Sequence, residues 1–329
     1  MTIAIRLASA FAVALAATIY SNGPTAAQDN AAGAAAECVA SKYGADDEIG
    51  AANLITPERV MAATQLVKLG KTHPLGIVVD PKMPAFPPRS MSLQVIAPNQ
   101  LQGADNSKSF GYDMTYNDDL AQLWFGTGPQ IDGLGHLSEG NVYYNCNKAA
   151  DFVKVTGLTK LGTHLIPPIV ARGVIIDMAK HKGVEALAGG EAITTADLEA
   201  AMEAQGVTIG EGDVVLVHTG WTDAKLVAEP QEWVSTEPGL DNAASEFLAS
   251  FNPVAVGADT WGLDVVPPVE GEKVFYGHVT LLARNGIYIL ETMDTGPLAA
   301  AGVNEFMFVL GQPRIKGTVQ MIINPVALY

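Results

Sequence analysis

Short, continuous apolar runs rich in β-branched residues constrain the fold of this chain more than any other feature. They do not alternate with polar residues, which is the pattern of strands covered on both faces. Helical patterns separate the runs between residues 173 and 258, whereas the C-terminal part reads mainly as strands. The sequence therefore predicts an α/β fold, a mixed β-sheet flanked by helices. The runs cover residues 173–176, 214–217, 254–256, 287–290, 307–310 and 319–323.

Three segments carry the signals that begin and end helices. Thr56 is followed by a proline and an acid, and apolar residues follow at helical spacing. Thr195 is expected to cap a second helix that ends at Gly206, and a third is expected over residues 241–251. Such caps supply the hydrogen-bond partners that free backbone groups at helix ends lack. We expect these helices to pack against the sheet.

The N-terminus resembles a secretory leader. Arg6 precedes an apolar stretch, residues 7–20, that is short for a bilayer span, and a Gly-Pro break and small residues follow. This order predicts a cleavable signal peptide over residues 1–27, cut after Ala27. An uncleaved anchor is the competing interpretation.

Residues 28–42 lack an apolar period and are predicted to form a tether, and residues 43–329 suffice for one large domain. The formal charge of the chain is −16, and loss of the leader, which contains Arg6 and no acid, makes it −17. An acidic surface repels phosphate backbones, so nucleic acid is excluded as a partner. We expect a periplasmic or secreted protein without a stable membrane anchor that acts on a small molecule.

The chain has two cysteines, Cys38 and Cys146. In an oxidising compartment they could form a disulfide that ties the N-terminal arm to the middle of the chain. Two unpaired buried thiols are equally compatible with the sequence.

A glycine-rich segment, residues 126–136, holds Asp132 and His136 four positions apart. Glycines let a backbone wrap closely around an ion or a substrate. A carboxylate and imidazoles brought together can hold a metal that acidifies a bound water. Alone, such a pair more often belongs to a simple turn with satisfied side chains.

Residues 126–136 resemble the signature of the metal-dependent cyclase family, which includes bacterial kynurenine formamidases and isatin hydrolases. That motif is written His-Gly-Thr-His-x-Asp-x-Pro-x-His. Residues 43–54 resemble the N-terminal block of one branch of the family, and residues 171–177 and 212–221 resemble its central strands. The resemblance covers nearly the whole mature chain and implies the family's swivelling β/β/α-like fold.

The resemblance also implies roles for individual residues. Asp132, His278 and Glu291 match metal ligands, and His136 matches the general acid/base. Gln130 replaces the second histidine of the motif, and the upstream histidine is also absent. We therefore expect one divalent ion, Zn²⁺ or Mn²⁺, held by the three ligands with help from the amide oxygen of Gln130.

Five further side chains are candidates for a substrate pocket. Aromatic residues near the motif could line an aromatic slot, although such residues more often pack a core. A histidine that ends an apolar run could reach a ligand at the sheet edge, although it could equally be structural. The candidates are Trp124, Tyr143, Tyr144, His218 and Trp261.

Together these features predict a metal-dependent hydrolase that cleaves an amide or ester bond in a small carbonyl compound. An arylformamidase acting on substrates of the N-formylkynurenine type is the leading prediction. Opening of a lactone or cyclic imide, of the dienelactone or isatin type, is the alternative, and a non-catalytic periplasmic binding protein is the third. The chain has no Gly-x-Ser-x-Gly motif, so no serine nucleophile is expected. The resemblance further implies a homodimer or homotetramer.

Overall fold

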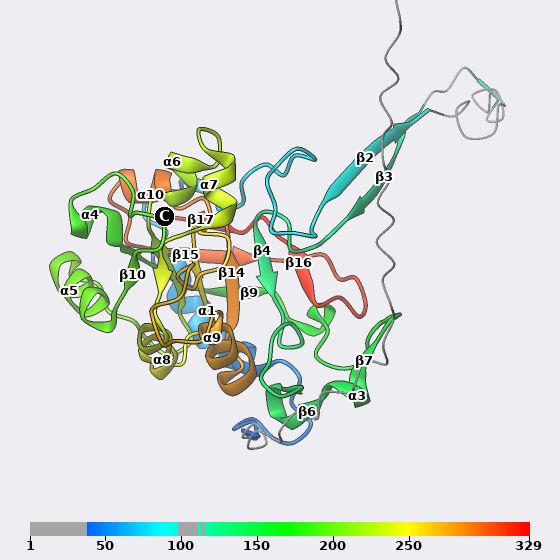
Figure 1. Ribbon diagram of the computed structural model, residues 1–329, viewed down its shortest axis with the longest axis horizontal. Coiled ribbons are helices and arrows are strands. Elements are labelled where there is room, and N and C mark those ends of the chain that lie inside the picture. Colours follow the sequence, from blue (N-terminus) through cyan, green and yellow to red (C-terminus); the bar gives the residue numbers. More distant parts are fainter. Residues whose placement is uncertain (1–37, 98–110, 113–115) are drawn as a thin grey trace, which may run out of the picture. The chain divides into compact units, whose positions relative to one another are not determined.

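The computed structural model describes residues 38–97, 111–112 and 116–329 (Figure 1). The predicted leader and residues 28–37 of the predicted tether lie outside this range. The described residues belong to one compact unit, Ala36–Tyr329. Within that part of the chain, no helix has both the length and the apolar character needed to cross a membrane.

A mixed sheet of nine strands forms the centre of this unit. Four neighbouring strands run parallel: β9 (Ile169–Asp177), β11 (Val214–His218), β13 (Ala255–Ala258) and β14 (Tyr288–Glu291). The strands on either side of these four pair antiparallel with them. The mixed sheet predicted from the sequence is thereby confirmed. In spatial order the strands are β1 (Thr72–Pro74), β17 (Val326–Leu328), β15 (Glu305–Leu310), β9 (Ile169–Asp177), β11 (Val214–His218), β13 (Ala255–Ala258), β14 (Tyr288–Glu291), β4 (Gln130–Asp132) and β16 (Gln320–Ile322).

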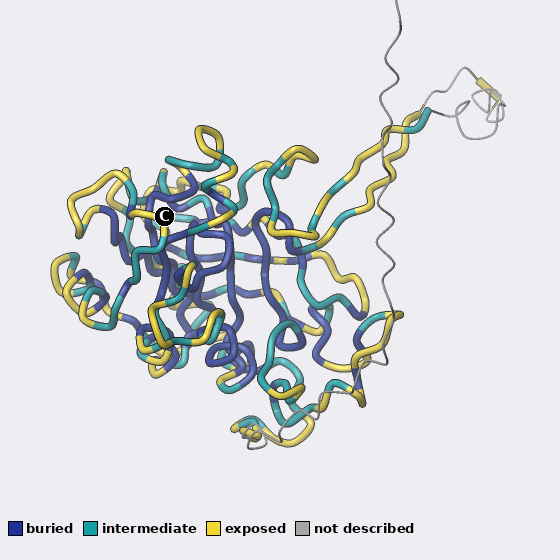
Figure 2. Tube along the Cα trace, in the orientation of Figure 1, coloured by how far each residue is buried: buried dark blue, intermediate teal, exposed yellow. Residues whose placement is uncertain are grey.

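The parallel strands are buried along almost their whole length (Figure 2). Helices α1 (Pro57–Thr64) and α5 (Thr195–Gln205) both pack against β9. Continuous apolar runs are stable here because neither face of these strands meets water. All six predicted runs coincide with strands of this sheet.

Side-chain caps fix the three predicted helices. Thr56 accepts a hydrogen bond from the Arg59 amide at the start of α1. The cap of α5 is Thr194, not Thr195 as predicted, because Thr194 and Asp197 form a reciprocal capping box. Asp241 caps α8 (Asn242–Ser250).

The remaining elements are short. The helical turns and helices are η1 (Gly50–Leu54), η3 (Tyr144–Cys146), α3 (Ala149–Phe152), η4 (Thr163–Leu165), α4 (Met178–Lys182), α6 (Trp221–Lys225), α7 (Pro230–Ser235), α9 (Tyr276–His278), η5 (Val279–Arg284) and α10 (Gly296–Ala300). Four two-stranded sheets pair β2 (Met91–Ile96) with β3 (Asp118–Leu123), β5 (Val142–Tyr143) with β6 (Asn147–Lys148), β7 (Val153–Lys154) with β8 (Gly157–Leu158), and β10 (Ala192–Ile193) with β12 (Gly239–Leu240).

A disulfide joins Cys38 to Cys146, which decides between the two alternatives left open by the sequence. The same region is held by hydrogen bonds: the Tyr144 hydroxyl donates to Asp47 Oδ2 at 2.6 Å, and the Asn145 amide donates to backbone carbonyls of residues 44, 45 and 47. The N-terminal segment is thereby fastened to the loop that follows β4.

Candidate metal centre

Two cross-strand pairs bring the predicted carboxylates together at the β14–β4–β16 end of the sheet. Glu291 on β14 lies opposite Gln130 on β4, and Asp132 on β4 lies opposite Gln320 on β16. Because side chains two positions apart in a strand share a face, Gln130 and Asp132 point to the same side. The strand register alone therefore gathers two carboxylates and two amides.

His278 approaches these carboxylates from the end of α9. Its Nε2 lies 3.1 Å from Glu291 Oε1 and 3.7 Å from Asp132 Oδ2. All three residues are buried, and each offers one ligand atom within 4.8 Å of the others. The structure thus brings together the three ligands predicted from the sequence.

The donor set fits a divalent cation. Asp132 Oδ2 is buried and, among the residues that the structure describes, has no hydrogen-bond partner. A buried carboxylate oxygen without a donor is unfavourable unless a cation neutralises it. Two carboxylate oxygens and one imidazole nitrogen suit either zinc or manganese.

The second oxygen of each carboxylate is occupied by a glutamine amide. Gln130 Nε2 donates to Asp132 Oδ1 at 3.2 Å and to Glu291 Oε2 at 2.5 Å, and Gln320 Nε2 donates to Asp132 Oδ1 at 2.7 Å. Gln130 was expected to offer its amide oxygen to the ion, but here its nitrogen faces the carboxylates. With these oxygens engaged, Asp132 Oδ2, His278 Nε2 and Glu291 Oε1 remain as the atoms that could hold a cation.

Asp264, which sequence reasoning missed, orients the histidine ligand. His278 Nδ1 donates to Asp264 Oδ2 at 2.6 Å, and the Gly277 amide donates to Asp264 Oδ1 at 2.7 Å. A proton on Nδ1 leaves the lone pair of Nε2 free for a metal. Burial acts to lower the pKa of His278, but hydrogen bonds to Asp264 and Glu291 outweigh it and raise that pKa well above its ordinary value.

The two carboxylates crowd one another. Burial, followed by the negative charge of Asp132, raises the pKa of Glu291 to about 7. Like charges held this close need a cation or a proton between them. The raised pKa of Glu291 and the unpartnered oxygen of Asp132 thus both indicate a place for a cation.

His136 lies beside the ligands. Its Nε2 is 3.7 Å from Asp132 Oδ2 and 3.5 Å from Gln320 Nε2. Burial lowers the pKa of His136, and the positive charges of His278 and Arg89 act in the same direction. A neutral imidazole can accept a proton, as the predicted general acid/base requires.

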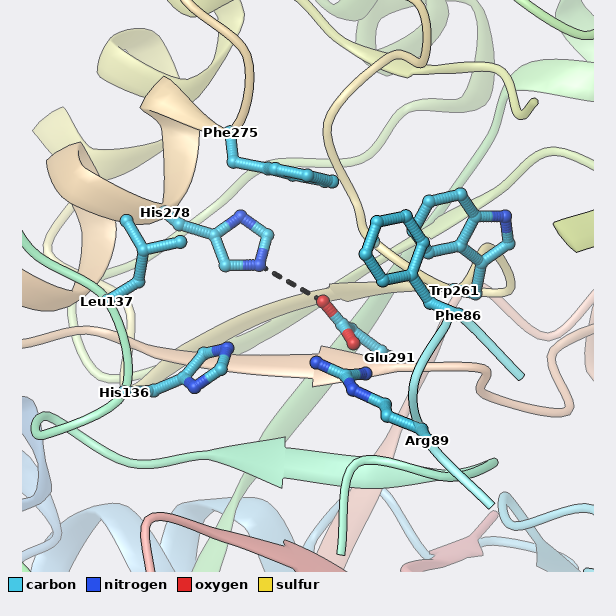
Figure 3. Close-up of a pocket in the computed structure, with 9 residues that line it drawn as sticks. Phe86, Arg89, His136, Leu137, Trp261, Phe275, His278 and Glu291 are labelled. Carbon is cyan, nitrogen blue, oxygen red and sulfur yellow. Dashed lines mark hydrogen bonds and ion pairs between the residues drawn. The ribbon is translucent and has the colours of Figure 1, made fainter. Parts of the chain in front are cut away.

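A cavity of about 180 Å³ opens onto this centre (Figure 3). Its walls combine the centre with three aromatic rings, of which Phe86 and Trp261 stack with centroids 5.1 Å apart. Of the predicted pocket residues, Trp261 is in place. The lining residues are Phe86, Arg89, His136, Leu137, Trp261, Gly262, Phe275, His278 and Glu291.

The other four pocket candidates lie outside this cavity. Trp124 is 52% exposed, beyond the end of β3. Tyr143 packs edge-on against Phe152, and the Tyr144 hydroxyl is used by Asp47. His218 Nδ1 lies 2.8 Å from the Thr295 hydroxyl. Tyr143, Tyr144 and His218 thus contact other residues, and Trp124 is exposed.

Comparison with known proteins agrees with the geometry. A model of the family described as "Putative cyclase" matches residues 72–265, more than half of the chain. The match includes Asp132 and His136 and ends before His278 and Glu291. A search of curated proteins finds no match.

Three solved structures illustrate the similarity. A structure described as a novel cyclase is 30% identical, with a TM-score of 0.76, over 88% of this chain and 96% of that chain. Isatin hydrolase A from Ralstonia solanacearum is 18% identical, with a TM-score of 0.59, over 83% and 97%. A predicted metal-dependent hydrolase from Bacillus stearothermophilus is 16% identical, with a TM-score of 0.50, over 78% and 97%. The last two comparisons show a shared fold. The family match and the first structure show that this chain belongs to the cyclase family.

Proposed function

We propose that this protein is a metal-dependent hydrolase that cleaves the amide bond of a small aryl formamide. One observation carries the proposal: Asp132, His278 and Glu291 converge within 4.8 Å beside His136, at the floor of an aromatic cavity. Carboxylate and imidazole ligands with an adjacent base are the parts that hydrolysis by an activated water requires.

The residues of the chain divide this work. A bound divalent cation would polarise the substrate carbonyl and lower the pKa of a water. His136 Nε2 is placed so that it would take a proton from the attacking water and give one to the leaving nitrogen. Asp264 keeps the Nε2 of His278 directed at the ligands, and Gln130 and Gln320 hold the carboxylates in position.

Opening of a cyclic imide or a lactone is the second candidate. The same ligands and base would serve it, because attack on a strained ring carbonyl needs the same polarisation and proton transfer. The fold shared with isatin hydrolase A favours this candidate. Here the leaving group stays attached to the product, so the reaction releases no second molecule.

We further propose export by the N-terminal leader and assembly into a homodimer or homotetramer. The Cys38–Cys146 disulfide is consistent with an oxidising compartment. N-terminal sequencing of the mature protein should begin near residue 28, and a start at Met1 would overturn the export proposal. Sedimentation analysis checks the assembly, since a monomer at working concentration contradicts it.

The enzyme proposal is tested with protein stripped by a chelator and reloaded with Zn²⁺ or Mn²⁺. We expect about one ion per chain by elemental analysis and metal-dependent hydrolysis of N-formylkynurenine, isatin or an unsaturated lactone. Asp132→Ala and His278→Ala should lose both ion and activity, whereas the control His181→Ala, on α4 away from the centre, should keep both. Binding of carbonyl compounds without any divalent ion would instead identify a sensor and refute the enzyme.

A further inference from the structure

We propose that Arg89 recognises a carboxylate on the substrate, so that the preferred substrate is a small aromatic compound carrying a carboxylate beside the scissile group. This substrate class rests on the proposed hydrolase function, but the binding part of the inference does not. It draws on a guanidinium in the cavity wall that forms no salt bridge with a carboxylate of the described residues.

Arg89 extends along one side of the cavity toward Glu291 and His136 (Figure 3). One of its nitrogens, Nη1, donates to the Gly126 carbonyl at 2.7 Å. Within residues 38–97, 111–112 and 116–329, Arg89 forms no ion pair with a carboxylate. The guanidinium carries five N–H donors, so most of them are available to a ligand.

The nearby carboxylates form no salt bridge with Arg89 and have other neighbours. Glu291 Oε2 accepts from Gln130, and Glu291 Oε1 faces His278 Nε2. Asp132 Oδ1 accepts from Gln320 Nε2, and Asp132 Oδ2 lies 3.7 Å from His278 Nε2. Burial raises the pKa of Glu291 and the charge of Arg89 acts to lower it, but these two side chains form no hydrogen bond or salt bridge with each other. The N–H groups of Arg89 that do not bind the Gly126 carbonyl therefore remain for a ligand.

Gly126 makes room for this arrangement. A Cβ at this position would lie 2.8 Å from both Cζ and Nη1 of Arg89. With only hydrogen there, the guanidinium can rest against the loop backbone, which fixes one edge and leaves the others open. A planar, anchored guanidinium is suited to bind a carboxylate through two parallel hydrogen bonds.

Aromatic rings line the cavity next to Arg89 (Figure 3). Phe86 stacks on Trp261, and Phe275 meets each of them at a centroid distance of 6.3 to 6.4 Å. The cavity volume of about 180 Å³ is below the roughly 300–1,000 Å³ typical of drug-sized sites. One ring with small substituents is the ligand that these walls and this volume accommodate.

Because the protein is acidic, binding of an anionic substrate requires a positive charge inside the cavity, and Arg89 supplies one. At a formal charge of −16, the protein as a whole repels anions. An anionic substrate therefore depends on a local cation for its affinity. Oxyanion stabilisation during catalysis is a different role, and it predicts an equal loss of kcat for charged and neutral substrates.

The test compares the binding of benzoate and benzamide, which have similar shape and differ in charge. Titration calorimetry on chelator-treated and metal-loaded protein should show tighter binding of benzoate in both forms. Arg89→Gln should weaken benzoate binding by about tenfold to a hundredfold and leave benzamide unchanged, as expected for loss of a hydrogen bond to a charged group. Arg89→Lys should restore part of the preference. Arg314→Gln, which also removes a guanidinium bonded to one backbone carbonyl, is the matched control and should have no effect.

The inference is overturned if the wild type does not prefer benzoate, or if the preference survives Arg89→Gln. Turnover supplies a second readout with formanilide and its ring-carboxylated analogue. Arg89→Gln should raise KM for the carboxylated compound alone, and an equal fall in kcat for both would place Arg89 in catalysis instead. If no compound is hydrolysed but benzoate binding depends on Arg89, the proposed function fails while the anion site stands.

Discussion

Replacing Asp264 with asparagine should weaken metal binding although Asp264 is not itself one of the three ligands. Both of its oxygens are used, one by the Gly277 amide at 2.7 Å and the other by His278 Nδ1 at 2.6 Å. Asparagine has a single acceptor oxygen. If that oxygen stays with Gly277, the amide NH₂ faces Nδ1, and the imidazole must move its proton to Nε2, which can then no longer bind the ion.

The expected size of the effect follows from this geometry. Loss of the partner that orients a histidine ligand typically reduces metal affinity by about 10- to 100-fold. This corresponds to about 1.4–2.7 kcal/mol, in line with about 1.5–3 kcal/mol for one hydrogen bond to a charged group. Asp264 is 3% exposed, so water cannot readily replace the missing acceptor.

Competition with a fluorescent chelator measures the affinity directly, and urea unfolding of the same variant reports any separate loss of stability. Asp177→Asn is the matched control. Asp177 is also a buried aspartate, and it accepts the Lys180 amide at the start of α4, where asparagine caps equally well. Unchanged metal affinity in Asp264→Asn would refute the role assigned to Asp264, and equal weakening in Asp177→Asn would show that the effect is not specific.

Three further outcomes are expected. His136→Gln should retain the ion by elemental analysis while kcat falls about a hundredfold or more, the scale of general acid/base catalysis, whereas loss of the ion would make His136 a ligand. Replacing both Cys38 and Cys146 with serine should lower the free energy of unfolding by about 2–4 kcal/mol, because the bond closes a loop across a separation of 108 residues; an unchanged urea midpoint would contradict this. Burial acts to raise the pKa of Asp197, but hydrogen bonds from Lys182 and the helix cap outweigh it and lower that pKa from 3.8 to about 2. The contribution of Asp197 to the free energy of unfolding is therefore fully present above pH 3.8 and is lost as the pH falls toward 2. Asp197→Asn should remove this part of the pH dependence from the acid unfolding curve. An unchanged curve would show that the carboxylate is not paired in solution.

The central sheet could be predicted from the sequence because its parallel strands are buried on both faces and therefore read as continuous apolar runs. The short strand β4 (Gln130–Asp132) was not predicted, since three residues among glycines are too few to show the apolar spacing of a strand or of a helix. Its place in the sheet is fixed by pairing with β14 and β16. Long-range pairing of this kind leaves no local trace in the chain.

The ligands could be predicted from a motif and two distant segments, but the residues that support them could not. Gln320 gave one usable signal, as a polar residue inside the apolar run 319–323. Asp264 and Arg89 lie in loops where nothing in the sequence separates them from ordinary surface charges. Tyr143 and Tyr144 were expected in the pocket because they are close to the motif in sequence. Closeness in sequence does not show the direction of a side chain, and the Tyr144 hydroxyl points to Asp47.

The cross-strand arrangement of the centre has a consequence for folding. Each carboxylate meets its amide only when β4 pairs with β14 and β16 in one alignment, and sliding β4 by a single position would turn Gln130 and Asp132 to the opposite face. A chain with that error would lack the cation site even if its hydrophobic core had closed. Uptake of the ion can therefore serve as a late checkpoint of assembly, distinguishing correctly aligned molecules from compact misaligned ones.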